Sequence, residues 1–178
     1  MLPSWFNPIF ESEVFSAIIF VLPTMFGNVT PPFFGGGLPM DFRKNWFDGK
    51  RILGNNKTIR GLLIGCLFGF LFGLFTRWWF LNYGGGAEIP YITGFLQGLG
   101  ALTGDAVGSF IKRRMNIPSG GSLVVMDQLG FVVFGLAFAR FVFPFEGIYW
   151  LIIIPLTLVV HFASNVLSYT LGLKDVWW

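Results

Sequence analysis

The chain has 178 residues, 54% of them hydrophobic and only 12% charged, which excludes an ordinary soluble domain and is typical of a polytopic membrane protein. The length predicts one domain over residues 1–178, and the single cysteine, Cys66, excludes an internal disulfide. The net charge of +3 does not predict a nucleic-acid partner, because in a membrane protein the placement of the charges matters more than their sum.

Apolar stretches follow one another along the chain, each close to the ~20 residues that cross a bilayer. Backbone groups in lipid must pair within the segment, so we expect an all-α integral membrane fold with five transmembrane helices. The expected spans are residues 14–34, 61–81, 89–111, 123–143 and 148–171. The first span contains Pro23, Asn28 and Pro31, which should kink it or end it early.

The basic residues orient these spans. Ten of the twelve Lys and Arg residues lie in segment 35–60, in the loop 112–122 and in the C-terminal tail, namely Arg43, Lys44, Lys50, Arg51, Lys57, Arg60, Lys112, Arg113, Arg114 and Lys174. The positive-inside rule therefore predicts a multi-pass protein of the cell membrane with its N-terminus outside and its C-terminus cytoplasmic. Trp177 and Trp178 would mark the inner interface.

Glycine recurs every four residues in the second and third expected spans. The rows are Gly61, Gly65, Gly69 and Gly73, and then Gly100, Gly104 and Gly108. Such small-residue faces let helices approach closely, so we expect tight packing there. In the third span the row runs beside an acid, where it can also leave room for a ligand.

That acid, Asp105, lies inside an apolar run where an unpaired charge costs about 3 kcal/mol or more. Ser109, Lys112 and Arg113 follow at helical spacing and share its face. A structural hydrogen bond within the bundle is one interpretation. The other is a functional site, because intramembrane acids usually face a cavity and have a partner.

Asp127 is the expected partner, because the short connection between the third and fourth spans makes them antiparallel neighbours. Both carboxylates should then lie at similar depth near the cationic end of the third span. Two carboxylates beside cations favour a site for Mg²⁺ and phosphate, with Asp105 and Asp127 as metal ligands and catalytic residues together with Lys112.

The first cytoplasmic segment contains GNNKT, which predicts further nucleotide-binding residues at Asn55, Asn56, Lys57 and Thr58. It is not a P-loop, because Arg51 and Asn56 occupy the glycine positions of that motif. The amides at the start of a helix together with a lysine can still bind phosphate. Ser109, Lys112, Arg113 and Arg114 are the other nucleotide-binding candidates, although some cations of this side serve only to set the topology.

Three residues are candidates for contact with a polar lipid head group: Asn28, His161 and Asn165. His161 and Asn165 are four apart and share a helical face. An interhelical hydrogen bond is the alternative role for the histidine.

Four stretches together, DGKRILGNNKT, GDAVGSFIKRR, DQLGF and HFASNVLSYTLGLKD, resemble the archaeal CDP-archaeol synthase family, a distant relative of the phosphatidate cytidylyltransferases. The resemblance runs from about Asn28 to the C-terminus. It implies a Mg²⁺-dependent cytidylyltransferase acting at the cytoplasmic face. The partners would be CTP and an isoprenoid ether-lipid phosphate, 2,3-bis-O-geranylgeranylglycerol phosphate (unsaturated archaetidic acid), and the products CDP-archaeol and pyrophosphate.

One position departs from the pattern of this family, whose members often have a second acid where this chain has Gly130. This departure leaves open whether one or two metal ions are bound. The sequence also leaves open the oligomeric state, the residues that recognise cytosine, and whether a diacyl lipid would serve.

Two other functions fit the sequence less well. A CDP-alcohol phosphotransferase would need DGxxAR…GxxxDxxxD, but Asp48 and Gly49 are followed by KRILG. A small nucleotide or anion transporter would favour repeat symmetry and midplane charges, whereas the polar residues here cluster at one membrane face.

Overall fold

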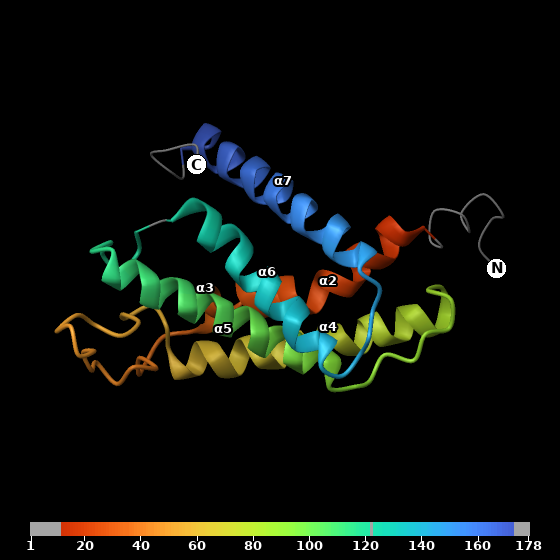
Figure 1. Ribbon diagram of the computed structural model, residues 1–178, viewed down its shortest axis with the longest axis horizontal. Coiled ribbons are helices and arrows are strands. Elements are labelled where there is room, and N and C mark those ends of the chain that lie inside the picture. Colours follow the sequence, from red (N-terminus) through yellow and green to blue (C-terminus); the bar gives the residue numbers. More distant parts are fainter. Residues whose placement is uncertain (1–11, 122, 173–178) are drawn as a thin grey trace.

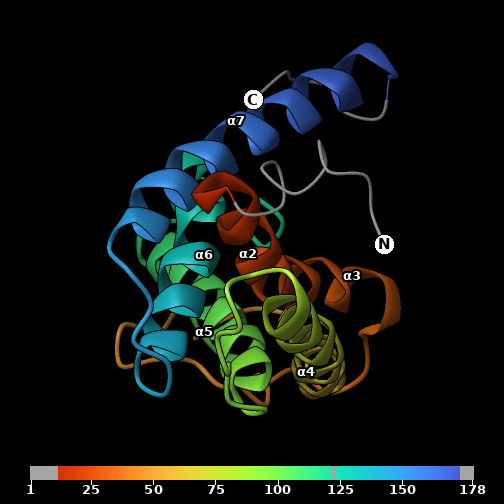
Figure 2. The same cartoon turned by 90° about the vertical axis from the view of Figure 1, so that its right-hand side faces the viewer.

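The computed structural model describes residues 12–121 and 123–172 of the chain, and within them the fold is helical, with isolated β-bridges and no strand. The expectation of an all-α fold is therefore confirmed. Figures 1 and 2 show the helices α2 (Glu13–Val29), α3 (Pro31–Phe34), α4 (Ile59–Asn82), α5 (Thr93–Arg114), α6 (Val124–Arg140) and α7 (Ile148–Thr170). Ser122, at the end of the expected loop 112–122, and Lys174, Trp177 and Trp178 of the C-terminal tail lie outside the described residues.

Three segments are long and apolar enough to cross a membrane: Glu13–Phe34, Ile59–Asn82 and Ile148–Leu167. Helices α5 and α6 are not among them. Helix α6 has only 17 residues, and α5 carries polar groups that pack inside the bundle. A helix enclosed by its neighbours does not need the apolar surface of one that faces lipid.

Pro23 does not end α2, although it removes one backbone hydrogen bond from the helix. The carbonyl left without that partner belongs to Ile19, and the Thr76 hydroxyl of α4 donates to it at 3.1 Å. One residue along, the Gln97 amide of α5 donates to the Phe20 carbonyl at 2.9 Å. Polar side chains of two neighbouring helices thus satisfy carbonyls of α2 around Pro23. The helix continues to Val29, and after Thr30 the short helix α3 begins at Pro31.

The third span begins and ends later than expected. Ile89 was expected to open the helix, but it is buried in a non-helical segment, where its carbonyl accepts a hydrogen bond from Arg77. Helix α5 therefore starts at Thr93 and runs on to Arg114. Lys112, Arg113 and Arg114 form its last turn instead of belonging to the following loop, and their charges suit the negative end of the helix dipole.

The glycine rows pack as expected, because they bring backbones into direct contact. A Cβ on Gly69 would lie 2.8 Å from the Cα of Gly98, and one on Gly73 would lie 2.5 Å from the Cα of Gly94. These contacts join α4 to α5. The row of α5 then diverges: Gly104 packs on α6, whereas a Cβ on Gly108 would meet nothing within 4 Å. The space expected beside Asp105 is therefore present at Gly108.

Aromatic side chains form a core where α2 meets the start of α7. Phe20 is fully buried, and its ring lies 4.8 Å from that of Phe145 and 5.5 Å from that of Tyr149. Tyr149 and Ile153 attach the first half of α7 to this core, while Val159 and Leu167 in its second half are exposed. In Figure 1, α7 runs obliquely across the other helices.

Candidate functional site

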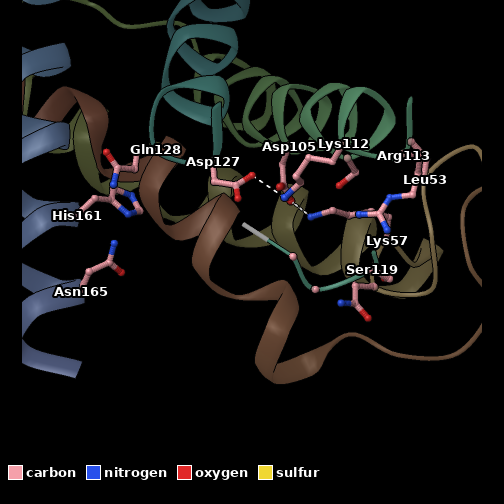
Figure 3. Close-up of a pocket in the computed structure, with 14 residues that line it drawn as sticks. Leu53, Lys57, Asp105, Lys112, Arg113, Ser119, Asp127, Gln128, His161 and Asn165 are labelled. Carbon is pink, nitrogen blue, oxygen red and sulfur yellow. Dashed lines mark hydrogen bonds and ion pairs between the residues drawn. The ribbon is translucent and has the colours of Figure 1, made fainter. Parts of the chain in front are cut away.

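The C-terminal end of α5 and the N-terminal end of α6 enclose a cavity of about 360 Å³, here called cavity one. It collects polar side chains from α5, α6, α7 and the segment before α4 (Figure 3). Its lining includes nine of the residues expected from the sequence: Asn56, Lys57, Asp105, Ser109, Lys112, Arg113, Asp127, His161 and Asn165. Residues separated by more than a hundred positions thus meet at one place.

Two ion pairs cross this cavity. Lys57 is bonded to Asp105, and the Lys112 ammonium lies 2.7 Å from an oxygen of Asp127. The other oxygen of Asp127 accepts the backbone N–H of Leu123 at 2.9 Å, which fixes the carboxylate at the start of α6. The expected meeting of both aspartates in one space beside cations is therefore found in the structure.

These four side chains are only partly shielded from water. The exposed fraction of the side chain is 28% for Asp105 and 31% for Asp127, against 24% for Lys57 and 11% for Lys112. Each charge thus has a partner, yet each is accessible to a molecule that enters the cavity. Such groups can change partner at a lower cost than fully buried ones.

Lys57 is positioned by the start of α4. Thr58 is the N-cap of this helix, and its hydroxyl oxygen accepts the N–H groups of Gly61 at 3.1 Å and of Gly36 at 3.2 Å. The predicted helix start beside Lys57 is present, but the Thr58 oxygen is engaged by these amides. Its role is first to cap the helix and to tie segment 35–58 to it.

A second cavity of about 570 Å³, here called cavity two, adjoins the first. It lies among α2, α3, α4 and α5, and its lining includes Asn28, Asn55 and Thr58. The structure therefore separates the three lipid-binding candidates, because Asn28 lines cavity two while His161 and Asn165 line cavity one. The His161 ring also packs against Phe131 of α6, with ring centroids 5.4 Å apart.

Arg113 and Arg114 have different surroundings, although the sequence placed them together. Arg113 lines cavity one, and its buried Nε has no hydrogen-bond partner among the described residues. Arg114 lines neither cavity. Its guanidinium stacks 3.8 Å from the Phe110 ring, lies 3.2 Å from Asp48 and donates to the carbonyl of Arg51 at 3.0 Å. Arg114 thus fastens segment 35–58 to the end of α5.

Asp41 holds that segment in shape, although it was not among the residues predicted for the site. It accepts both Nε and Nη2 of Arg51, at 3.2 and 2.8 Å, and the backbone N–H groups of Arg43, Leu53 and Gly54, each at 3.0 Å. Burial alone would raise the pKa of Asp41, but Arg51 and the three N–H groups outweigh it and hold this pKa well below its usual range.

The hydrogen-bonded cluster of Asp41 with Arg51 and the N–H groups of Arg43, Leu53 and Gly54, here called the clasp, also contacts the site. Gly54 has a φ of +112°, and a Cβ there would lie 3.1 Å from the Ser119 hydroxyl in the loop between α5 and α6. Since Ser119 and Leu53 both line cavity one, this contact sets one wall of it. A local signal existed in the sequence, because aspartate often accepts the N–H two residues ahead, as Asp41 does from Arg43.

The donor set fits magnesium better than zinc. The described residues contain no group of three or more His, Cys, Asp and Glu side chains that could enclose a metal ion. Two carboxylates, Asp105 and Asp127, line both cavities with the oxygens of Ser109, Asn56 and Gln128 nearby in cavity one. Magnesium is commonly held by one or two carboxylates together with waters and substrate phosphates, without a complete protein cage.

Comparison with known proteins extends these observations over nearly the whole chain. The CarS-like family model, CDP-archaeol synthase, matches residues 10–178. The CDP-archaeol synthase of Methanocaldococcus jannaschii is 41% identical over 176 residues, covering 95% of this chain and 99% of the relative. That of Pyrococcus abyssi is 41% identical over 175 residues, covering 97% and 99%.

A solved structure gives the same result for the fold. It is described as an intramembrane enzyme for archaeal membrane lipids biosynthesis, and it superposes with a TM-score of 0.76 at 34% identity, covering 86% of this chain and 95% of its own. The helical fold, the apolar spans and the full-length match agree with one another. The chain is a member of the CDP-archaeol synthase family.

Proposed function

We propose that this protein transfers CMP from CTP to 2,3-bis-O-geranylgeranylglycerol phosphate, forming CDP-archaeol and pyrophosphate. The observation that carries the proposal is the pair of Lys–Asp contacts, Lys57 with Asp105 and Lys112 with Asp127, inside one cavity of a chain of this family. Acids suited to a metal and cations suited to phosphates thus lie within one hydrogen bond of each other.

The reaction is an in-line displacement at phosphorus. An oxygen of the lipid phosphate forms a bond to the α-phosphorus of CTP, and the bond from that phosphorus to the bridging oxygen of the β-phosphate breaks. The electron pair leaves with pyrophosphate. Because the attacking phosphate is already an anion, no general base is needed, and catalysis rests on positioning and charge neutralisation.

The two ion pairs can supply both positioning and charge neutralisation by exchanging partners when the nucleotide binds. Asp105 and Asp127 would hold the metal ion of a metal–nucleotide complex in place of their ammonium partners. Lys57 and Lys112 then turn to phosphate oxygens, and Arg113 adds its unpartnered Nε. Each charge has a partner before and after binding, so no charge is left alone in the partly dry cavity.

Asp105 and Asp127 are the residues that would hold magnesium, which when bound polarises the α-phosphate and offsets the developing charge. The remaining task of the chain is to hold the triphosphate in one orientation. Lys112 is suited to this task, because its side chain is 11% exposed and points along the cavity from the end of α5. Ser109, buried one turn before it, offers a hydroxyl on the same face.

The membrane setting completes the proposal. The chain crosses the bilayer five times, with its N-terminus outside, its C-terminus in the cytoplasm and the site at the cytoplasmic face. The basic residues of segment 35–58 and of the end of α5 support this orientation. The site then lies where a lipid head group and a water-soluble nucleotide can meet.

The test is transfer of label in detergent. The purified protein is incubated with CTP labelled at the α-phosphate, Mg²⁺ and either the geranylgeranyl ether phosphate or phosphatidic acid. Label in the lipid phase is expected with the wild type and with Asp48→Asn, a control acid outside both cavities, but not with Asp105→Asn. No labelled lipid from a wild-type protein that binds CTP would refute the synthase assignment and favour a nucleotide carrier.

A further inference from the structure

The two cavities share one wall. Asn56, Lys57, Asp105 and Asp127 line both of them. From this wall, cavity one extends toward α7 and the loop between α5 and α6, whereas cavity two extends toward α2, α3 and the start of α4. The Lys57–Asp105 pair therefore lies at the junction of the two cavities, and each cavity forms one branch that extends away from it.

The two branches differ in charge. Among the described residues, cavity one is lined by three cations, Lys57, Lys112 and Arg113, whereas the cation of cavity two is Lys57. The acids are the same two in both. A triphosphate needs more positive charge than a phosphate monoester, so the cation-rich branch matches the nucleotide and the other branch matches a single phosphate group.

The two branches also differ in their walls. Cavity two is lined by apolar side chains that cavity one lacks, namely those of Pro31, Pro32, Met40, Leu62 and Leu102. Leu102 lies three residues before Asp105 on α5, about 4.5 Å further from the cationic end of the helix. Outside the cavity, Phe33 of α3, which follows Pro32 in the chain, is 76% exposed. Cavity two therefore has apolar walls next to an exposed apolar side chain, which suits the chains of a lipid.

We propose that cavity two binds the head group and the first part of the chains of the lipid phosphate, while cavity one binds the β- and γ-phosphates of CTP. The α-phosphate then lies at the shared wall. In-line displacement requires the attacking group and the leaving group to approach phosphorus from different sides, and two branches that diverge from one wall provide this. The inference rests on the proposed function and adds the place of each substrate.

This assignment separates residues that the sequence grouped. Asn28 contacts the lipid phosphate side, together with Thr58, whose hydroxyl proton is still available after its oxygen has accepted two backbone N–H groups. His161 and Asn165 belong to the nucleotide side, because they line cavity one.

The test separates the Michaelis constants of the two substrates. Leu62→Trp fills cavity two, and Leu63→Trp is its matched control, because the neighbouring side chain faces outward and lines neither cavity. Arg113→Met removes a charge from cavity one, and Arg60→Met is the control, because Arg60 is exposed and lines neither cavity. Each variant is assayed with CTP and with the geranylgeranyl ether phosphate varied in turn.

Leu62→Trp should raise the KM for the lipid phosphate at least fivefold and change the KM for CTP less than twofold. Arg113→Met should do the reverse, and both controls should match the wild type. The opposite pattern, or equal effects on both constants, would overturn the assignment. Failure of the wild type to form CDP-lipid would instead refute the proposed function, so the two failures are distinguishable.

A second variant covers the case in which Leu62→Trp does not fold. Asn28→Asp is nearly isosteric and places a negative charge in cavity two. It should raise the KM for the lipid phosphate at least threefold, while the Kd of CTP measured in Mg²⁺ without lipid stays within twofold. A weakened CTP affinity with an unchanged KM for the lipid would overturn the assignment.

Discussion

Asp41 and Asp105 are both acids bonded to a cation, but they belong to two regions with different purposes. Asp41, in the clasp of segment 35–58, has a side chain with no exposed surface and accepts five N–H groups from Arg51 and the backbone. Asp105, in the site, is 28% exposed and is paired with Lys57. The Asp41 carboxylate accepts five N–H groups and therefore stabilises a loop. The Asp105 carboxylate is partly exposed and has one cationic partner, so it can exchange that partner for a ligand.

The largest expected difference between the regions is in catalysis. Asp105→Asn should lower kcat about a thousandfold, because it would remove a proposed metal ligand worth several kcal/mol to the transition state. Its Tm in detergent should stay near that of the wild type, since Lys57 is partly exposed and can turn to water. A large fall in Tm would show that Asp105 is structural, like Asp41.

Asp41→Asn should instead affect stability more than catalysis. It should lower the free energy of unfolding by about 2 kcal/mol, because Arg51 loses its anion and backbone N–H groups lose a charged acceptor. The Tm in detergent measures this loss, and Asp48→Asn, on the exposed Arg114 contact, is the control with a small effect. An unchanged Tm for Asp41→Asn would contradict the clasp.

The clasp also predicts a pH dependence. The pKa of Asp41 is lower in the folded protein than in the unfolded chain, so its stabilisation is present above the unfolded pKa of about 4 and is lost as the pH falls toward the folded pKa. The difference in Tm between the wild type and Asp41→Asn should therefore be constant from pH 7 to about 5 and shrink below about 4. A difference that grew on acidification would have the wrong sign.

The smallest expected effect separates Arg113 from Arg114. Arg114→Lys should destabilise the protein by about 1 kcal/mol, because lysine cannot reproduce both the stacking on Phe110 and the bonds to backbone carbonyls. Its KM for CTP should stay within twofold of the wild-type value. A large rise in that KM would place Arg114 beside the nucleotide, as the sequence alone suggested.

The residues of regular helices were easier to predict from the sequence than the contacts of irregular segments. Asp105, Lys112 and Asp127 stood out because charges are rare in apolar runs, and helical spacing places Asp105 and Lys112 on one face. The clasp of Asp41 on Arg51, the separate position of Arg114 and the division into two cavities depend on where segment 35–58 folds back. Contacts between irregular segments have no periodicity, so the sequence pattern did not reveal them.

The start of α5 at Thr93 was also not predicted, because the segment before it is irregular and has no periodicity. Residues 89–92 are apolar and lengthened the expected span, but Ile89 packs in the core outside a helix and gives its carbonyl to Arg77. Packing does not explain Gly130, where the sequence departs from the family pattern, because a Cβ there would lie 3.4 Å from the carbonyl oxygen of Gly104, an ordinary contact. A Cβ on Gly104 would overlap the Gly130 carbonyl, so α5 and α6 approach closely at this level.

Titration of CTP into the wild type and into Asp105→Asn, each with Mg²⁺ and with EDTA, tests the exchange of partners most directly. The wild type should bind CTP at least tenfold more tightly with Mg²⁺, because on this proposal Lys57 would leave Asp105 only when the carboxylate holds the metal ion. Asp105→Asn leaves Lys57 free, so it should bind CTP in EDTA more tightly than the wild type does and gain little from Mg²⁺. Equal or weaker binding of CTP by Asp105→Asn in EDTA would contradict the exchange.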